Sequence, residues 1–347
     1  MHSKTRRRLL GAAAATTALG LTTGLARPAR AQAKPIELKL SHWVPVGHVF
    51  HQHVLLPWVE MVEKNSGGRL KITIFPGSVL GKAADHWDMA QNGIVDIAWG
   101  SHTYTTGRFP LTSVINLPFL TKTAKGGSRA VWEYYLKHLQ KEHARVKVLW
   151  LYCIPPFQLH LTKKAALTPD QFAGMRIRAG GGAVSDIVKA LGGVPIAMVL
   201  PEAYNALERG IIDGTALPYE ALHSFKLAEV TKHHVETSMY TDAHFFTMNL
   251  AKYNSLPADL KKVLDDLGGA WGAEFAGTEW DKGEQPGIEA GRKAGNQFYK
   301  LTPEQRNLWI EKAKVVEVEW LRAMEAKGLP GKQALGDLRE LLKRYDS

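Results

Sequence analysis

Apolar residues at positions 35–249 follow two alternating spacings, one typical of strands and one typical of helices. Continuous or alternating apolar runs predict strands at 35–40, 70–75, 94–99, 146–154, 175–178 and 242–249. Apolar residues that recur every three or four positions predict helices at 51–63, 82–91 and 126–140, and a further helix from 183 onward. Strands that alternate with helices are typical of α/β folds with a largely parallel sheet.

Helical patterns dominate after the last of these strands. Leu256–Asp281 predicts a long helix, interrupted near Gly268 and stopped before Pro286, because proline lacks the N–H that a helix interior needs. Thr302–Gln305 (TPEQ) is a capping box that begins another helix, and a final helix is predicted around Asp337–Lys343. Long helices that follow two α/β lobes predict a brace across both.

A helix–turn–strand module occurs twice along the chain. Trp87–Asp96 (WDMAQNGIVD) and Tyr204–Asp213 (YNALERGIID) share an aromatic start, a glycine, an isoleucine and a final aspartate. The break at Pro155-Pro156 separates them and is the expected first domain crossing. The repeat predicts two lobes of like construction, with the strand ends Ser101-His102 and Pro218-Tyr219 directed toward the space between them. Chance similarity of two amphipathic turns is the competing interpretation.

The first 31 residues have the pattern of an export signal. Lys4–Arg8 is a basic cluster, Leu9–Ala26 is apolar, and a small-x-small cleavage site ends at Ala31, with Ala33 as the alternative. Thr5–Leu10 (TRRRLL) fits a twin-arginine signal, and an ordinary secretory signal is the competing interpretation. We therefore expect an exported protein located in the periplasm, with no stable insertion in the membrane.

Charge and cysteine usage narrow the possible partners. The formal net charge of +11 falls to +5 once the signal, which carries six Lys and Arg and no Asp or Glu, is removed. Nucleic acid is a poor fit, because no basic stripe with interleaved aromatic residues is present. The single cysteine, Cys153, excludes an internal disulfide and lies in an apolar strand, which favours an inert thiol over a nucleophile. A small acidic ligand remains compatible with this composition.

A strand that ends at Arg178 runs into three glycines, Gly180–Gly182, and then into a helix that starts near Ala183. Ligands of open α/β sheets bind beyond the carboxyl ends of strands, and helix starts present free N–H groups. The arginine fork matches a carboxylate in two hydrogen bonds. The stretch predicts an anion-recognition corner. An exposed arginine beside a flexible turn is the competing interpretation.

The fourteen histidines raise the possibility of a metal site. His48, His51 and His53 are the densest group, but His53 lies about 140° from His48 on a helix, and a His-Glu-x-x-His motif is missing. We therefore expect no metal and no cofactor, with His42 or His48 as possible cleft-lining residues instead. Gly180–Gly182 is not followed by Lys-Ser/Thr, so it is not a phosphate loop. The twin-arginine signal nevertheless keeps open the alternative of an exported metal- or cofactor-dependent periplasmic enzyme.

Short motifs occur in a set order along essentially the whole mature chain. They are Gly67–Ile72, Phe75–Ser78, Gly93–Ala98, Leu117–Leu120, Gly174–Arg178, Ala206-Leu207, Gly210–Gly214, Met248-Asn249 and Leu256-Pro257. Together they resemble the solute-binding subunits of tripartite ATP-independent periplasmic (TRAP) transporters. The resemblance implies an α/β, two-lobed periplasmic binding protein fold with a cleft between the lobes and a long helix spanning both.

The resemblance also implies how the chain is divided and what it does. After the signal at 1–31, lobe I is expected at 32–155 plus 244–285, and lobe II at 156–243 plus 286–347. The implied function is not enzymatic. It is the capture of a small organic carboxylate by lobe closure and its delivery to the TRAP membrane permease subunits. A sensory or scaffold module that uses the same fold is a further alternative.

The family's pattern gives Arg178 the role of gripping the ligand carboxylate. Leu217 replaces the asparagine of many members, Gln158 falls near the place of a second arginine, and Leu200 replaces an aromatic residue. These departures predict an apolar pocket and an aromatic or aliphatic monocarboxylate, or a hydroxy or keto acid. The residues expected around the ligand body are Trp43, Phe157, Leu200, Leu217 and Tyr219. Those expected to recognise a hydroxyl or keto group are Gln158, His160, His102 and Glu220.

Overall fold

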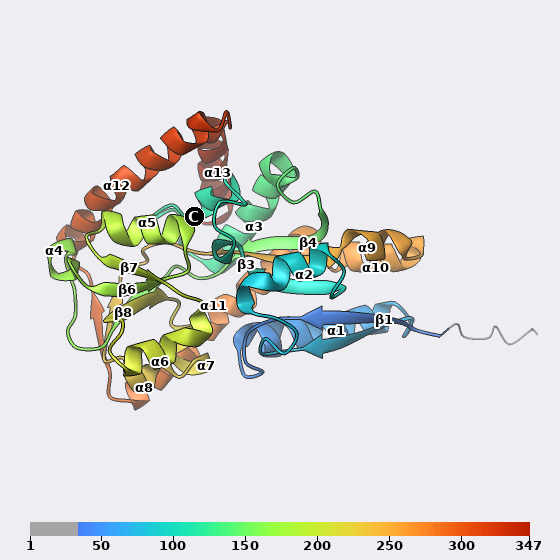
Figure 1. Cartoon of the computed structure of the whole chain (residues 1–347), viewed down its shortest axis with the longest axis horizontal. Coiled ribbons are helices and arrows are strands. Elements are labelled where there is room, and N and C mark those ends of the chain that lie inside the picture. The colour runs from blue at the N-terminus through green and yellow to red at the C-terminus, as the bar shows by residue number, and fades with distance from the viewer. Residues whose placement is uncertain (1–33) are drawn as a thin grey trace, which may run out of the picture. The chain divides into compact units, whose positions relative to one another are not determined.

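The computed structural model describes residues 34–347 (Figure 1). The predicted export signal at 1–31, its twin-arginine motif and the alternative cleavage positions Ala31 and Ala33 lie outside the described residues. Within residues 34–347, every helix is too short or too polar to cross a bilayer.

Two β-sheets form the cores of the two α/β lobes that the sequence predicts (Figure 1). The sheets are mixed rather than largely parallel, because β10 and β5 each run antiparallel to both of their neighbours. The first sheet has the order β2-β1-β3-β10-β4 and the second the order β11-β9-β5-β8-β6-β7. The strands of the first sheet are β1 (Ile36–Ser41), β2 (Leu70–Phe75), β3 (Ile97–Ser101), β4 (Val146–Cys153) and β10 (Ala243–Asn249). The strands of the second sheet are β5 (Gln158–Leu161), β6 (Arg176–Ala179), β7 (Val194–Ala197), β8 (Gly214–Leu217), β9 (His233–Glu236) and β11 (Gln297–Lys300). We call the lobes built on these sheets the first and the second lobe.

The strand β10 returns the chain from the second sheet to the first. It runs antiparallel to both of its neighbours, β3 and β4. Six of its seven residues are buried, which explains why it appears in the sequence as a nearly continuous apolar run. Its Phe246 packs against Trp58 and Trp150, with ring centroids at 4.9 and 4.2 Å. This aromatic packing forms much of the first lobe's core.

Helices cover the sheets of both lobes (Figure 1). Their bounds are α1 (Leu56–Asn65), α2 (His86–Gln91), α3 (Ala124–Tyr134), α4 (Pro169–Phe172), α5 (Gly182–Ala190), α6 (Ala203–Glu208), α7 (Glu220–Ser224), α8 (Leu227–Val230), α9 (Leu250–Ser255), α10 (Ala258–Asp266), α11 (Gly269–Lys293), α12 (Pro303–Ala326) and α13 (Gly331–Tyr345). π-Helical segments at Phe50–Leu55 and Tyr135–Leu139 and short 3₁₀ turns complete the set. The predicted capping box of α12 is confirmed, because Thr302 and Gln305 each accept from the other's backbone N–H at 3.2 and 2.9 Å.

The prediction that the long helix stops before Pro286 is wrong. The helix α11 continues through Pro286 to Lys293, although an interior proline costs about 3 kcal/mol. Packing overrides this local penalty. Gly277 lies against the backbone of α3, and a Cβ at Gly287 would stand 1.9 Å from the carbonyl oxygen of Tyr219. The helix therefore contacts both lobes, which confirms the predicted brace.

Two further segments differ from expectation in where they begin or pack. The strand predicted from Ile94 begins at Ile97, because the N–H groups of Ile94 and Val95 donate to the carbonyl of Met89 and finish the turn after α2. The C-terminal helix α13 packs on α3 of the first lobe, where the Asp346 carboxylate accepts from the Thr123 N–H at 2.9 Å. The sequence places residues 286–347 with the second lobe, and the lobe boundaries stay a prediction.

Candidate functional site

A small buried cavity of about 30 Å³ lies between the two lobes at Arg178. Such a volume holds roughly one or two water molecules. The first lobe and α11 contribute Trp43, His48, Tyr104, Ile154, Asp242, His244 and Trp280 to its lining. The second lobe contributes Phe157, Arg178, Leu200, Leu217, Pro218, Glu220 and Ala221. Six of the ten residues predicted from the sequence therefore line one cavity, namely Trp43, Phe157, Arg178, Leu200, Leu217 and Glu220.

Arg178 lies on β6, near the carboxyl end of the strand, and is only 4% exposed. Its Nε donates to the carbonyl of Met198 at 3.0 Å, and its Nη2 donates to the hydroxyl oxygen of Tyr104 at 3.1 Å. Among the described residues, neither a carboxylate within 4 Å nor a partner for Nη1 is found. A buried cation of this kind calls for an anion from outside the chain, because burial without a counter-charge is costly.

Tyr104 joins the two lobes at this arginine. Its hydroxyl oxygen accepts from Arg178 and also from the backbone N–H of Leu200 at 3.1 Å. Tyr104 follows β3 in the first lobe, whereas Arg178 and Leu200 belong to the second. Burial raises the pKa of the Tyr104 phenol, so the hydroxyl keeps its proton. That proton is a second donor beside the arginine fork.

Aromatic rings form the cavity wall on the first lobe's side. Trp43, in the loop after β1, stacks on Trp99 with ring centroids 5.3 Å apart and planes 13° from parallel. It also stacks on Phe225 of the second lobe at 6.0 Å, and the edge of Tyr104 meets it at 5.6 Å. Flat aromatic surfaces of this kind favour a planar, apolar ligand body.

A carboxyl of the second lobe that also lines the cavity lies against the first lobe. Glu220 accepts from the N–H of Val49 at 3.4 Å and lies 3.4 Å from Nε2 of His48. Nδ1 of His48 accepts from the N–H of Phe50 at 3.0 Å, so Nε2 carries the proton that faces Glu220. Burial raises the pKa of Glu220 to about 7 and holds the pKa of His48 well below its usual value.

Asp242 and His244, at the start of β10, are cavity residues that the sequence interpretation missed. Oδ2 of Asp242 accepts from the hydroxyls of Ser101 at 2.5 Å and Thr103 at 3.2 Å, and Nε2 of His244 lies 3.2 Å from it. These residues could have been found from the direction of their strand. A strand antiparallel to β3 begins at the carboxyl end of β3, and ligands bind at that edge of a sheet.

Four of the predicted residues do not line this cavity, and two of them are histidines used inside the lobes. His102 bonds to the carbonyl of Ala243 at 3.0 Å and to His143 at 2.9 Å. His160 bonds to the carbonyl of Leu217 at 3.0 Å and to His234. Burial lowers the pKa of His160 to about 4, so this imidazole is neutral and serves the packing of the second sheet.

Gln158 and Tyr219 are the other two predicted residues that do not line the cavity. The Gln158 amide donates to the carbonyl of Pro156 at 3.0 Å and accepts from the N–H of Ser238 at 2.9 Å, which fixes the bend before β5. The Tyr219 ring packs against His160 and Phe298, with centroids at 5.6 and 5.8 Å. Both side chains face the second lobe's own core rather than the space at Arg178.

The three-glycine turn also has a different role from the predicted one. Gly181 has φ +118° and begins α5, and a Cβ at Gly180 would stand 2.7 Å from Oγ1 of Thr103. The turn therefore needs glycine because it lies close to the first lobe. Residues of the turn and of the start of α5 are not part of the cavity lining, so the anion-recognition corner reduces to Arg178 itself.

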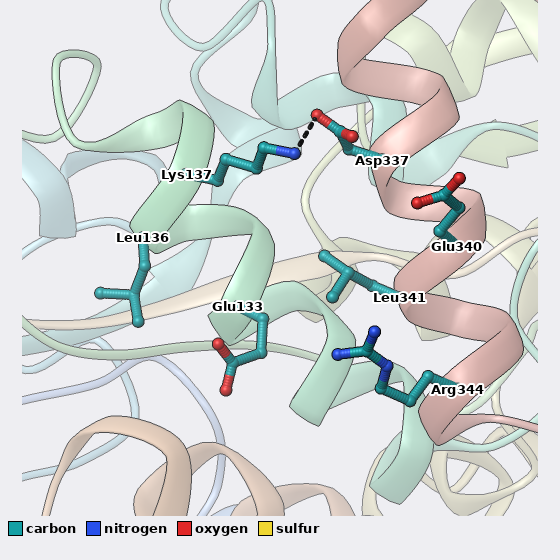
Figure 2. Close-up of a pocket in the computed structure, with 7 residues that line it drawn as sticks. All are labelled: Glu133, Leu136, Lys137, Asp337, Glu340, Leu341 and Arg344. Atoms are coloured by element: carbon teal, nitrogen blue, oxygen red, sulfur yellow. Dashed lines mark ion pairs between the residues drawn. The ribbon is translucent and has the colours of Figure 1, made fainter.

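A larger hollow of about 410 Å³ lies between α3, with the π-helical segment after it, and α13 (Figure 2). Lys137 points to Asp337 there, with Nζ and Oδ2 2.8 Å apart, and His138 lies 2.7 Å from the same oxygen. The lysine is mostly exposed and already paired, so the interaction is screened by solvent. This hollow is a weaker candidate for holding a small anion than the buried arginine.

Metal and thiol chemistry find little support in the described part of the chain. Residues 34–347 contain no group of three His, Cys, Asp or Glu side chains placed to hold a metal ion. His42 and His51 bond to each other at 2.8 Å, and burial lowers the pKa of His42 to about 3. Burial also raises the pKa of the Cys153 thiol far above its usual value, which keeps it unreactive.

Comparison with known proteins decides the family. Residues 40–322 match the model of the family described as bacterial extracellular solute-binding protein, family 7. The chain belongs to this family. The TRAP solute-binding subunit inferred from the motifs is thereby confirmed, and the alternative of an exported enzyme is set aside, because this family-7 protein and its structural neighbours are binding proteins.

Relatives of this family-7 protein span nearly its whole length. It is 28% identical over 320 residues to the C4-dicarboxylate-binding periplasmic protein DctP of Rhodobacter capsulatus, covering 88% of this chain and 91% of that protein. It is similar, at 32% identity and a TM-score of 0.88, to a TRAP solute-binding protein from Rhodoferax ferrireducens in complex with copurified benzoate, covering 89% and 98% of the two chains. A TRAP periplasmic protein from Bordetella bronchiseptica with bound (R)- and (S)-mandelate is 35% identical, with a TM-score of 0.84 and coverage of 90% and 100%.

Proposed function

We propose that this protein captures an aromatic monocarboxylate, or a hydroxy or keto acid of similar size, in the cavity at Arg178. The observation that carries the proposal is a buried guanidinium with a donor free toward the cavity and without a carboxylate within 4 Å in residues 34–347. The ligand carboxylate accepts from Nη1 of Arg178 and from the hydroxyl of Tyr104. Such charge-assisted bonds are about twice as strong as neutral ones.

The rest of the lining supports an aromatic body rather than a sugar acid. Trp43 and Phe157 provide flat rings, and Leu200 and Leu217 provide aliphatic surface. Two structural neighbours with TM-scores of 0.84 or more hold benzoate and mandelate. These acids share one carboxylate and one phenyl ring, which matches an arginine at one end of an aromatic-walled space.

The small volume of the cavity supports entry by lobe opening. An apolar cavity of about 150 Å³ accommodates benzene, whereas this space measures about 30 Å³. A benzoate-sized ligand therefore enters only when contacts across the lobes separate, including the Trp43–Phe225 stack and the Arg178–Tyr104 bond. Closure then removes water from the ion pair. Truncating one partner of a buried pair costs on the order of 2–5 kcal/mol, against roughly 0–1 kcal/mol for an exposed pair.

We further propose that the mature protein acts in the periplasm and delivers its ligand to TRAP membrane permease subunits. Membership of family 7 and the twin-arginine-like signal at positions 1–31 support this role. A sensory use of the same closing fold makes a different prediction. A transport protein restores uptake of the acid when it is supplied to vesicles that contain the permease pair, whereas a sensory module does not.

The decisive experiment is the melting temperature of the purified protein, without residues 1–31, in a panel of small acids. The panel contains benzoate, phenylacetate, mandelate, succinate and glucuronate, each with and without chelator. We expect a rise with the aromatic acids that chelator leaves unchanged, since a ligand at 100 times its Kd adds about 2.7 kcal/mol to stability. A rise with succinate or glucuronate alone contradicts the aromatic assignment, and a fall on chelation points instead to a bound metal.

A further inference from the structure

Two buried polar atoms of the cavity lining are without hydrogen-bond partners. They are Nε1 of Trp43 and Nδ1 of His244, and their side chains are 4% and 3% exposed. Neither atom finds a donor or acceptor anywhere in residues 34–347. Buried polar atoms are paired in most proteins, and each unpaired one costs about 1–3 kcal/mol. Their place in the lining indicates that a ligand group supplies the partner.

The surroundings of His244 define what this partner must be. Its Nε2 lies 3.2 Å from Oδ2 of Asp242, which already accepts from the hydroxyls of Ser101 and Thr103. A carboxylate oxygen that accepts from its neighbours requires Nε2 of His244 to carry a proton. Nδ1 is then the ring atom left without a partner, and it accepts in the neutral imidazole and donates in the charged one.

The indole of Trp43 has a fixed requirement. Its Nε1–H is a donor only, so it needs an acceptor from the ligand. Trp43 and His244 both pack against Trp99, with ring centroids at 5.3 and 5.0 Å, so both belong to the first lobe's wall facing Arg178. A ketone only accepts and an ammonium only donates, whereas a hydroxyl does both. A hydroxyl is therefore the group among these three that satisfies the indole and either form of the histidine.

We propose that His244 and Trp43 select a ligand that carries a hydroxyl group in addition to its carboxylate. This inference rests on the proposed function, because Arg178 must first hold the carboxylate at the second lobe's side. It replaces the residues expected from the sequence to recognise a hydroxyl, of which Gln158, His160 and His102 lie outside the cavity. The ligand class narrows from aromatic monocarboxylates in general to hydroxy-substituted ones.

The test compares acids that differ in one group, by isothermal titration calorimetry. Mandelate, phenylacetate and phenylglycine carry a hydroxyl, a hydrogen and an ammonium at the same carbon, and 3-hydroxybenzoate is paired with benzoate. We expect the hydroxylated member of at least one pair to bind about tenfold more tightly to the wild-type protein, the value of one hydrogen bond to a buried partner. Phenylglycine should bind more weakly than mandelate.

Two variants connect this preference to the named side chains. His244→Phe should reduce the hydroxyl preference, the ratio of the affinities for the hydroxylated and the unsubstituted acid, to within about twofold. Trp43→Phe removes the indole N–H and keeps a stacking ring, so it should reduce the preference partly, and it serves if His244→Phe does not fold. His102→Phe is the matched control, because His102 is also a buried histidine of the first lobe but lies outside the cavity.

The outcomes separate this inference from the function on which it rests. If the acids bind but neither hydroxyl gives a gain, or if the gain survives both substitutions, the hydroxyl assignment is overturned and the aromatic-acid function stands. A higher affinity for phenylglycine than for mandelate overturns it in favour of an amino acid. If none of the acids binds the wild-type protein, the proposed function itself is wrong.

Discussion

The two helix–turn–strand modules, α2 with β3 in the first lobe and α6 with β8 in the second, share a hydrogen-bond pattern. In the first, Asp96 accepts from the N–H of Lys39 at 2.7 Å and its own N–H donates to the Lys39 carbonyl at 3.0 Å. In the second, Asp213 accepts from the N–H of Arg176 at 2.9 Å and donates to its carbonyl at 2.7 Å. Each aspartate joins the start of its strand to the neighbouring parallel strand, which supports like construction over chance similarity.

The turns between helix and strand have the same backbone geometry in the two modules. Gly93 and Gly210 have φ of +72° and +66°, a region that glycine occupies without strain. The next residue in each turn, Ile94 and Ile211, donates its N–H back to the preceding helix at 2.9 Å. The two modules thus have one backbone design.

The two lobes differ in the side chains on the strands that each module pairs with, β1 in the first lobe and β6 in the second. Two residues after Lys39 stands Ser41, whose hydroxyl bonds to His86 inside the first lobe at 3.2 Å. Two residues after Arg176 stands Arg178, which faces the cavity. One backbone design therefore lies beside a core hydrogen bond in one lobe and beside a buried cavity-lining arginine in the other. The comparison teaches that the repeat fixes positions, and that single side chains at those positions decide the chemistry.

The helix α11 adds a second difference, because its carboxyl half holds the strand end of the second module. Glu284 accepts from the N–H groups of Tyr219 and Glu220 at 3.2 and 3.0 Å. Gly287 lets the helix backbone approach the Tyr219 carbonyl closely. In the first module the corresponding N–H, that of Thr103, bonds to the hydroxyl of Ser101 instead.

Gly287→Ala should have the largest effect on stability, because it forces α11 away from the second module. The added Cβ would lie 1.9 Å from a backbone oxygen, which cannot rotate aside. We expect a loss on the order of 3 kcal/mol in the free energy of unfolding, measured by chemical denaturation. Gly336→Ala in α13 is the control. Nothing lies within 4 Å of its Cβ, so it should stabilise by about 0.5–1 kcal/mol. Equal losses in both variants would contradict the close approach.

Substitution of the two aspartates tests whether the modules are equivalent. Asp96→Ala leaves the Lys39 N–H without its acceptor and should cost about 1 kcal/mol. Asp213→Ala should cost somewhat more, about 1–2 kcal/mol, because Asp213 also bonds to the Arg176 guanidinium at 2.7 and 3.0 Å, a pair that solvent screens in part. Denaturation midpoints measure both. A neutral result for either one would mean that the shared pattern contributes nothing to that lobe.

The pH dependence of stability tests the second module's contact with α11. Burial raises the pKa of Glu220 to about 7 and that of Glu284 to about 8, above the ordinary 4.5. Each carboxyl therefore adds stability that is complete below pH 4.5 and is lost as the pH rises through its folded pKa. We expect these two carboxyls to lower the melting temperature as the pH rises from about 4.5 to 8, and Glu284→Gln to flatten this decline. If the melting temperature of the variant depended on pH as that of the wild type does, Glu284 would not be a cause of the decline.

Buried histidines determine how the stability of the protein changes at low pH. Burial lowers the pKa of His42 to about 3 and those of His143 and His160 to about 4, below the ordinary 6.5. Their contribution is complete above pH 6.5 and is lost as the pH falls through these values. The histidines should therefore lower the melting temperature as the pH falls below 6.5, and below pH 4.5, where Glu284 is protonated in both states, this loss should be unaffected by Glu284→Gln.

The sequence predicted the parts of the fold that depend on local pattern. Strand runs such as Leu70–Phe75, the capping box at Thr302 and the repeat of the two modules are set by spacing and by turn residues, and the structure has them where expected. The path of α11 through Pro286 depends on contacts with residues that are distant in sequence, so local penalties pointed to the wrong end of the helix.

Sequence reasoning found the cavity residues that stand at the carboxyl end of a predicted strand. Arg178 and Leu217 follow this rule and line the cavity. His102 and Tyr219 occupy equivalent places in the two modules, and neither faces the cavity, whereas Tyr104 and Ala221, two residues further on, both do. The direction in which a chain turns after its strand is a tertiary property. Asp242 and His244 stand at the start of β10 and Trp280 stands on α11, so a rule based on strand ends did not find them.

The most direct test of the central claim is the affinity of Arg178→Lys for the acid that gives the largest melting shift, measured by calorimetry. Arg176→Lys is the control, since Arg176 lies on the same strand but pairs with Asp213 on the surface. Lysine keeps the charge and loses the planar fork, so we expect the Kd to rise by about 30-fold or more with Arg178→Lys and by less than about twofold with Arg176→Lys. An Arg178→Lys protein that folds and binds the acid as tightly as the wild type would contradict carboxylate capture by Arg178.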